Sequence, residues 1–312
     1  MGVLAKEGWA LDGVAFFEGE LVPLAHAKVS IATHAFNYGT GCFEGIRAYW
    51  NADERQLYLL KADAHYRRML RSAHILTIQI PYSVEELVQW TLELLRANHF
   101  ESDVYIRPLA YKADPAIKVS LGGLRDAFSM FALPMGDYVP VQGLRVQVSS
   151  WRRLSDNMIP SRAKVTGAYI NAALASEQAH RDGYDEAIML ADDGHVSEAS
   201  SSNLFLVRQG TLVTTPVTAD ILEGVTRQLV LELAQANHIP VEIRPIDRTE
   251  LYTADELFLC GTGVQLAAIT EVDHRVVGTG GTGRITGELQ SQYFQAVRGQ
   301  LAAFRDWVIP VY

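Results

Sequence analysis

Residues 134–143, PMGDYVPVQG, interrupt the pattern of strands and helices that runs through the rest of the chain. Two prolines and two glycines in this short stretch oppose regular structure, because proline removes a backbone donor and glycine loosens the backbone. A chain of 312 residues is also too long for one small core. We therefore expect two domains, residues 1–133 and residues 144–312, joined by a linker at 134–143.

Strand and helix signals alternate on both sides of this linker. Before it, the patterns predict a hairpin over 13–24, a strand followed by an amphipathic helix over 55–76, a helix over 82–100 and two strands of one sheet over 103–114 and 124–135. Ser83 and Glu86 are spaced as a capping box at the start of the second helix. After the linker, they predict a strand over 144–151, a helix following Lys164, a hairpin turning at 193–194, a helix over 224–238 and a terminal helix from about residue 282. The predicted fold class is α+β, with mixed sheets and no parallel dinucleotide-binding pattern.

Charge and cysteine content narrow the class of protein. A net charge of −9 argues against a nucleic-acid or anionic-membrane partner. Cys42 and Cys260 are far apart, which predicts two buried thiols in a reducing compartment. No apolar run approaches the ~20 residues of a membrane span, and the start of the chain lacks a signal-peptide core. The nine histidines include no pair at metal-ligand spacing on one helix face, so we expect no metal. These features predict a cytoplasmic protein of the size of an enzyme.

Lys164 is the last of only six lysines in a chain that otherwise uses arginine. Lysine can lose its proton and form an imine, which arginine cannot. Glu198 follows at the end of a predicted hairpin strand, and LEGVTRQL begins a helix with backbone amides at 224–226. An imine-forming lysine, an acidic residue and an anion-binding helix start are the parts that a pyridoxal-phosphate site needs. A solvated lysine is the alternative.

Six segments, in this order, resemble the branched-chain-amino-acid aminotransferases, which are fold-type IV pyridoxal-phosphate enzymes. They extend over roughly residues 10 to 305 and read HAFNYGTGCFEGIRAY, YIRPL, AKVTGAYIN, GYDEAIMLADDGHVSEASSSNLF, LEGVTRQ and LYTADELFLCGTG. The resemblance implies a smaller N-terminal α/β sandwich and a larger C-terminal domain with a mixed sheet or pseudo-barrel, like the D-amino-acid aminotransferases. It also implies pyridoxal 5'-phosphate as cofactor and a homodimer or higher homo-oligomer, with Tyr38 and its surroundings reaching the partner subunit's site.

The resemblance assigns cofactor roles to individual positions. Lys164 would bind the cofactor covalently and move the substrate proton. Glu198 would keep the pyridine nitrogen protonated, and Tyr169 would donate to the phenolic oxygen of the ring. Arg68 would bind the phosphate, with its neighbour Arg67 as the competing choice. The other implied cofactor-binding positions are Leu222, Val225, Thr226 and Thr262.

Substrate roles follow in the same way. The aromatic walls would come from Tyr38, Phe43, Tyr138 and Tyr169. The α-carboxylate would be held by Tyr105 with the backbone of Thr262 and Gly263. Arg107 would pair with the far carboxylate of glutamate, and Arg47 would support it. Taken alone, YIRPL favours a strand whose arginine ends in solvent, and FEGIRAY in register turns the choice to the substrate role.

The implied reaction is a ping-pong transamination between branched-chain L-amino acids (leucine, isoleucine, valine) and 2-oxoglutarate. Two departures from the family pattern leave alternatives open. The family is usually glycine-rich after the glutamate, whereas Ser200–Ser202 resembles the D-amino-acid aminotransferases, and Ala267-Ala268 stands where Thr-Pro is frequent. The alternatives are a D-amino-acid or (R)-amine transaminase, a dual-specificity enzyme, a lyase with the same cofactor, or a non-catalytic carrier. FEGIR and YIRP favour the branched-chain type.

Overall fold

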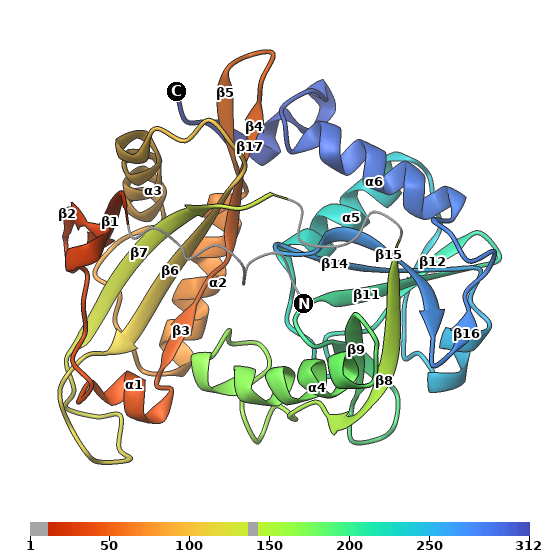
Figure 1. The fold of residues 1–312 in the computed structure, drawn as a ribbon, viewed down its shortest axis with the longest axis horizontal. Helices are drawn as coiled ribbons and strands as arrows, with labels where there is room; N and C mark the ends of the chain where they lie inside the picture. Colours follow the sequence, from red (N-terminus) through yellow and green to blue (C-terminus); the bar gives the residue numbers. More distant parts are fainter. Residues whose placement is uncertain (1–11, 137–142) are drawn as a thin grey trace. The chain divides into compact units, whose positions relative to one another are not determined.

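A computed structural model describes residues 12–136 and 143–312 of the chain (Figure 1). The chain divides into two compact units. The N-terminal unit contains residues 12–136, 163–168 and 296–312 of the described part, and the C-terminal unit contains residues 143–162 and 169–295. Residues 137–142 of the predicted linker, and with them Tyr138, lie outside the described residues.

The N-terminal unit is built on an eight-stranded sheet in the order β17-β5-β4-β6-β7-β1-β2, with β3 also paired to β6. The described pairs of this sheet are antiparallel. Its strands are β1 (Val14–Phe17), β2 (Glu20–Pro23), β3 (Gly41–Phe43), β4 (Ile46–Asn51), β5 (Gln56–Leu60), β6 (Val104–Lys112), β7 (Asp126–Pro134) and β17 (Val308–Pro310). Its helices are α1 (His34–Tyr38), α2 (Ala62–Ile75) and α3 (Val84–Asn98), with 3-10 turns at Leu24–His26, Thr166–Ala168 and Ala302–Trp307.

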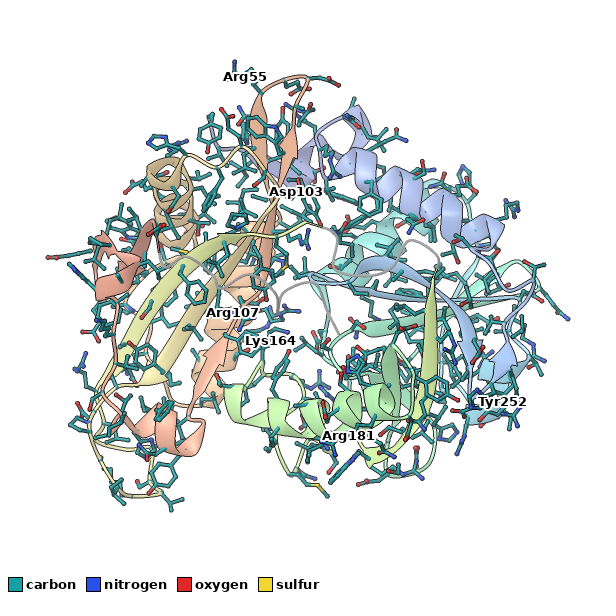
Figure 2. The ribbon with its side chains drawn as sticks, in the orientation of Figure 1. Arg55, Asp103, Arg107, Lys164, Arg181 and Tyr252 are labelled. Carbon is teal, nitrogen blue, oxygen red and sulfur yellow. The ribbon has the colours of Figure 1, made fainter. Side chains whose placement is uncertain are left out.

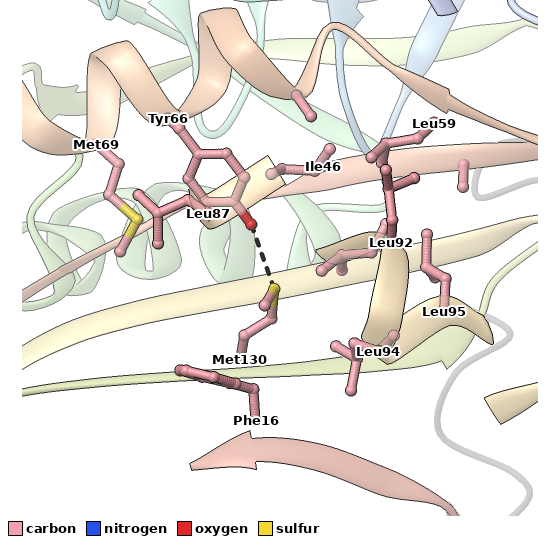
Figure 3. Close-up of a cluster of buried hydrophobic side chains, with 14 of the residues drawn as sticks. Phe16, Ile46, Leu59, Tyr66, Met69, Leu87, Leu92, Leu94, Leu95 and Met130 are labelled. Atoms are coloured by element: carbon pink, nitrogen blue, oxygen red, sulfur yellow. Dashed lines mark hydrogen bonds between the residues drawn. The ribbon is translucent and has the colours of Figure 1, made fainter. Parts of the chain in front are cut away.

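One face of this sheet packs against α2 and α3. Tyr66 and Met69 of α2 and Leu94 of α3 are fully buried together with Phe16 and Met130 from the strands (Figure 3). The Tyr66 hydroxyl donates to the Met130 sulfur at 3.2 Å, so the phenol keeps a polar partner inside the core. The residues of this sheet that are predicted to bind substrate lie on its other face.

Residues 163–168 join the N-terminal unit although their neighbours on both sides belong to the C-terminal unit. Val165 bridges Cys42 of β3, and the Gly167 amide donates to the Gly39 carbonyl at 3.2 Å. Gly39 has φ +67°, and a Cβ there would lie 2.7 Å from the Gly167 Cα. Glycine is therefore required by both the backbone conformation and the close approach.

The C-terminal unit is built on a nine-stranded mixed sheet in the order β10-β9-β8-β15-β14-β11-β12-β13, with β16 paired to β15. The pairs β8–β9, β8–β15 and β12–β13 are parallel. Its strands are β8 (Leu144–Arg152), β9 (Glu186–Leu190), β10 (Val196–Ala199), β11 (Asn203–Arg208), β12 (Thr211–Thr214), β13 (Val241–Ile243), β14 (Glu256–Gly261), β15 (Gln265–Val272) and β16 (Arg275–Val276). Its helices are α4 (Tyr169–Arg181), α5 (Val225–Ala236) and α6 (Arg284–Ala296), with a 3-10 turn at Arg248–Tyr252.

The predicted elements are present, including the capping box in which Ser83 and Glu86 bind each other's backbone amides. The two-domain α+β class is confirmed. The predicted contiguous ranges 1–133 and 144–312 differ from the observed units because residues 163–168 pair with β3 and β17 pairs with β5. Among the described helices, none is long and apolar enough to cross a membrane.

Candidate active site

Four of the predicted substrate residues lie on one face of the N-terminal sheet. Along β6 buried and half-buried residues alternate, so Val104 and Ile106 enter the core while Tyr105 and Arg107 point to the other face. Directly opposed residues of antiparallel strands share a face. Arg47 of β4 is opposite Tyr105, and Phe43 of β3 is opposite Leu109. The register therefore brings Phe43, Arg47, Tyr105 and Arg107 together.

Two basic side chains, those of Arg107 and Lys164, lie near the ring of Phe43. The Arg107 guanidinium carbon lies 4.4 Å from the centroid of the Phe43 ring, and the Lys164 Nζ lies 5.1 Å from the same centroid. Figure 2 shows Arg107 and Lys164 as neighbours. One Nη2 hydrogen of Arg107 is donated to the Tyr105 hydroxyl at 2.9 Å, while its buried Nε has no partner among the described residues. Because a buried donor without a partner is costly, this arginine is suited to an anion.

The backbone of Lys164 is held by two hydrogen bonds. Its amide donates to the Ser72 Oγ at 3.1 Å, and its carbonyl accepts from the Phe43 amide at 3.1 Å. Ser72 is fully buried and donates its own proton to the Arg68 carbonyl at 3.0 Å. The hydroxyl of one serine therefore connects the Lys164 backbone to the turn of α2 that carries Arg68.

Arg68 belongs to a buried ionic cluster with Glu44 and His65. Its Nε and Nη2 donate to the two Glu44 carboxylate oxygens at 2.7 Å each, and the His65 Nδ1 lies 2.8 Å from Glu44 Oε2. Burial would raise the pKa of Glu44, but Arg68 and His65 together hold it well below its ordinary value. Burial lowers the pKa of His65 against the opposing effect of Glu44. Glu44 is therefore an anion, and neutral His65 donates its Nδ1 proton to it.

Glu198 is the corresponding buried carboxylate of the C-terminal unit. Its Oε1 pairs with Arg153 Nη2 at 2.7 Å, and its Oε2 accepts from Asn203 Nδ2 at 2.8 Å. The Leu222 amide lies 3.3 Å from both oxygens. Donors on both oxygens favour the ionised form of a carboxylate. A buried anion held in this way is suited to face a cationic N–H group such as a pyridinium.

The start of α5 lies next to Glu198 through Leu222, three residues before Val225. Gly224 is the N-cap, and among the described residues no side chain caps this helix. Thr226 is buried in the first turn. Thr262 and Gly263 form the turn between β14 and β15, and at Gly261 an added Cβ would lie 3.3 Å from Ser202 Cβ. An uncapped helix start with a threonine in its first turn suits a phosphate.

The remaining predicted residues have these positions. Tyr169 is the first residue of α4. Tyr38 ends α1, with its ring against His34 at 4.7 Å between centroids. Arg47 donates to the carbonyls of Met135 and Gly136 at 3.2 and 2.9 Å, so its guanidinium holds the end of β7. Arg67 is exposed and pairs with Asp63, whereas Arg68 is buried.

The class IV amino-transferase family model matches residues 41–272 of the chain. The probable branched-chain-amino-acid aminotransferase of Aquifex aeolicus is 48% identical over 96% of both chains. The branched-chain aminotransferase of Thermoproteus uzoniensis, solved with norvaline, superposes with a TM-score of 0.93 at 42% identity, covering 96% of this chain and 99% of the other. The branched-chain amino acid aminotransferase of Thermobaculum terrenum, solved in its PLP form, gives a TM-score of 0.93 at 34% identity, again covering 96% of this chain and 99% of the other.

The chain belongs to the class IV aminotransferases, in the branched-chain-amino-acid group. These comparisons confirm the resemblance found in the sequence, and the two-unit fold agrees with them.

Glu44, His65, Ser72, Arg153 and Asn203 were not predicted as site residues. Two of them stand inside recognised segments, Glu44 in FEGIR and Asn203 in SSSNLF. His65, Ser72 and Arg153 lie outside these segments, and only the contacts described above identify them as part of the site. A signal existed for Glu44 alone, since it lies between two strands of a largely apolar segment, and a buried carboxylate requires a cationic or hydrogen-bonding partner.

The lowered pKa of His65 predicts acid sensitivity. In the unfolded chain His65 has the ordinary pKa of 6.5, so it binds a proton that the folded protein excludes. The contribution of neutral His65 to stability is fully present above the unfolded-state pKa of 6.5 and is lost as the pH falls below 6.5. We expect the free energy of unfolding to decrease from about pH 7 to about pH 5, by at most ~1.4 kcal/mol per pH unit from this group.

His65→Asn keeps an N–H donor for Glu44 without a titrating group. Urea unfolding of this variant should give a flatter pH dependence than the native chain over the same range. Exposed His26→Asn is the control and should keep the native slope. An unchanged slope in His65→Asn would show that His65 is not the acid-sensitive group.

Proposed function

We propose that this aminotransferase catalyses the pyridoxal-phosphate-dependent transfer of the amino group of leucine, isoleucine or valine to 2-oxoglutarate, by a ping-pong mechanism. The observation that supports this most is the pair of cations at Phe43, where Lys164 Nζ and the Arg107 guanidinium lie 5.1 and 4.4 Å from one ring centroid. An amine for covalent chemistry and a guanidinium for a carboxylate therefore flank an apolar wall, as a substrate with an apolar side chain or a second carboxylate requires.

The residues of the chain suit pyridoxal phosphate, which when bound supplies an electron sink for the substrate's α-carbon. Lys164 would attach it, and Glu198 would hold the proton on its ring nitrogen. Arg68 and the uncapped start of α5 at Val225 and Thr226 would bind its phosphate. The remaining implied contacts, from Tyr169, Leu222 and Thr262, belong to the same proposal.

Lys164 would also remove the α-proton of the substrate. The two backbone hydrogen bonds that hold its main chain leave only the side chain to move, so the amine can act as a positioned base. Tyr105, whose hydroxyl accepts from Arg107, would orient the α-carboxylate with the backbone of Thr262 and Gly263. Arg47 would act indirectly, by holding the chain at Met135 and Gly136.

The serine run favours a second candidate function, transamination of D-amino acids or (R)-amines. Ser202 is buried, and its Oγ has no hydrogen-bond partner among the described residues. A hydroxyl at this position could hold a substrate carboxylate in another orientation. The separate proposal of a cytoplasmic location is supported by the two cysteines of the chain, Cys42 and Cys260, which are both free and buried.

The proposed assembly is a homodimer or a higher homo-oligomer. An apolar patch on the N-terminal unit consists of Val29, Ile31, Phe36, Ile117 and Val119, of which Ile31 and Val119 are 83% and 85% exposed. Buried His34 joins its two segments through the Lys118 carbonyl at 2.6 Å. Exposed apolar groups gathered in this way indicate a protein interface, and Tyr38 lies in the same helix as Phe36.

The substrate enantiomer tests the function directly. Purified yellow protein mixed with L-leucine, without any oxo acid, should lose its visible absorbance, because the amino group passes to the cofactor. D-Leucine should leave the absorbance unchanged. Bleaching by D-leucine or an (R)-arylamine would support the second candidate, and a protein that stays colourless with pyridoxal phosphate would contradict the cofactor.

Lys164→Ala should reduce turnover at least ~10²-fold.

Arg107→Ala should separate the two kinds of substrate. Removing a charge-assisted hydrogen bond to a carboxylate costs ~1.5–3 kcal/mol. We expect kcat/KM for 2-oxoglutarate to fall roughly 10- to 100-fold further than kcat/KM for the oxo acid of leucine. Exposed Arg67→Ala should change neither. Equal losses for both substrates would show that Arg107 does not bind the far carboxylate.

Phe36→Asp should weaken the proposed interface. A charge at a desolvated contact lacks a partner, so sedimentation velocity should show a shift towards monomer at micromolar concentration. Ile243→Asp, an exposed apolar position in β13 of the C-terminal unit, is the matched control and should keep the native assembly. A Phe36→Asp chain that sediments like the native protein would remove this patch from the interface.

A further inference from the structure

Asn203 connects Glu198 to the loop that begins α5. One hydrogen of its Nδ2 is donated to Glu198 Oε2 at 2.8 Å and the other to the Leu222 carbonyl at 3.0 Å. A primary amide has two such hydrogens, so both are used. The Asn203 side chain is buried, so water does not readily replace these bonds when they are lost.

Gly224 packs closely against this amide. An added Cβ at Gly224 would lie 2.0 Å from Asn203 Oδ1. The backbone of Gly224 is extended, with φ −68° and ψ 133°, which any residue can adopt. Glycine is therefore required here by the contact with Asn203 and not by the backbone conformation.

Arg153 makes a second connection between the same two elements. Its Nη2 pairs with Glu198 Oε1 at 2.7 Å, and its Nε donates to the Asp220 carbonyl at 3.3 Å. The Leu222 amide adds a direct contact to the carboxylate. Glu198 and the loop 220–224 thus form one network, whose central bridge is the Asn203 amide packed on Gly224.

We infer that Asn203 is a positioning residue which, with Gly224, sets the separation between the carboxylate of Glu198 and the anion-binding start of α5. This rests on the proposed function, in which Glu198 serves the ring nitrogen and the start of α5 serves the phosphate of one cofactor. A ligand with both groups benefits from a fixed separation, because the protein does not have to be ordered when it binds. A ligand with only one of the groups gains nothing from it.

The inference predicts a selective loss of affinity. Full-length protein, freed of bound aldehyde with hydroxylamine and dialysed, is titrated with pyridoxal phosphate, pyridoxal and inorganic phosphate. Absorbance follows the two aldehydes, and phosphate is measured by competition. Asn203→Ala should weaken pyridoxal phosphate about tenfold, the effect of losing one hydrogen bond to a charged group. Pyridoxal and inorganic phosphate should each change by less than about threefold.

Gly224→Ala provides an independent variant that retains every hydrogen-bonding group. Its new methyl group should displace the Asn203 amide and cause the same selective loss. In the double variant Gly224→Ala/Asn203→Ala the clash is removed, so the loss should be no greater than that of Asn203→Ala alone. Gly287→Ala, where an added Cβ makes only an ordinary 3.6 Å contact, is the control and should bind all three ligands normally.

The outcomes separate this inference from the proposed function. Native protein that gains no visible absorbance with pyridoxal phosphate would contradict the proposed function itself. Native protein that binds it, with Asn203→Ala equally weakened for all three ligands or for none, would overturn the positioning role. Additive losses in the double variant would show that Gly224 does not act through Asn203.

Discussion

The pairing of residues 163–168 with β3 is the constraint on which the proposed chemistry depends. The chain on both sides of this segment belongs to the C-terminal unit, yet Lys164 is fixed to the N-terminal unit by Ser72 and the Phe43 amide. The close contact of Gly39 with Gly167 completes this attachment. As a result, the amine of Lys164 and the guanidinium of Arg107 face the same aromatic ring.

In each unit, one buried carboxylate is bound by an arginine and by a neutral N–H donor. Glu44 is bound by Arg68 and the neutral N–H of His65, and Glu198 is bound by Arg153 and the amide of Asn203. An ion pair removed from water gains little net stability, so we attribute these clusters to orientation and not to the strength of the fold. The neutral donor in each cluster, His65 or Asn203, adds a hydrogen bond to the carboxylate without adding a second positive charge.

The order of elements could be predicted because it follows from local periodicity. Tyr105 and Arg107 alternate with buried residues, and Ser83 and Glu86 form the expected capping box. It could not be predicted that residues 163–168 and β17 belong to the N-terminal unit, because both depend on pairing between residues far apart in sequence.

The supporting residues of the site were missed for a related reason. Ser72 binds the Lys164 amide 92 positions away, and Arg153 pairs with Glu198 on another element, so no local pattern records these contacts. Asn203 is close to Glu198 in sequence, but its second bond, to the Leu222 carbonyl, reaches a loop 19 positions away. The resemblance favours Arg68 over Arg67 for the phosphate, and of the two Arg68 is the buried one, paired with Glu44. The phosphate role of Arg68 remains a proposal.

The attachment point of the cofactor tests the proposed role of Lys164. Protein loaded with pyridoxal phosphate is treated with borohydride, which makes the bond to the protein permanent, and is then digested and analysed by mass spectrometry. The proposed role of Lys164 predicts a pyridoxyl group on the peptide that contains Lys164 and on none of the other five lysines. A modified Lys61 or Lys112, or the absence of any stable adduct, would contradict it.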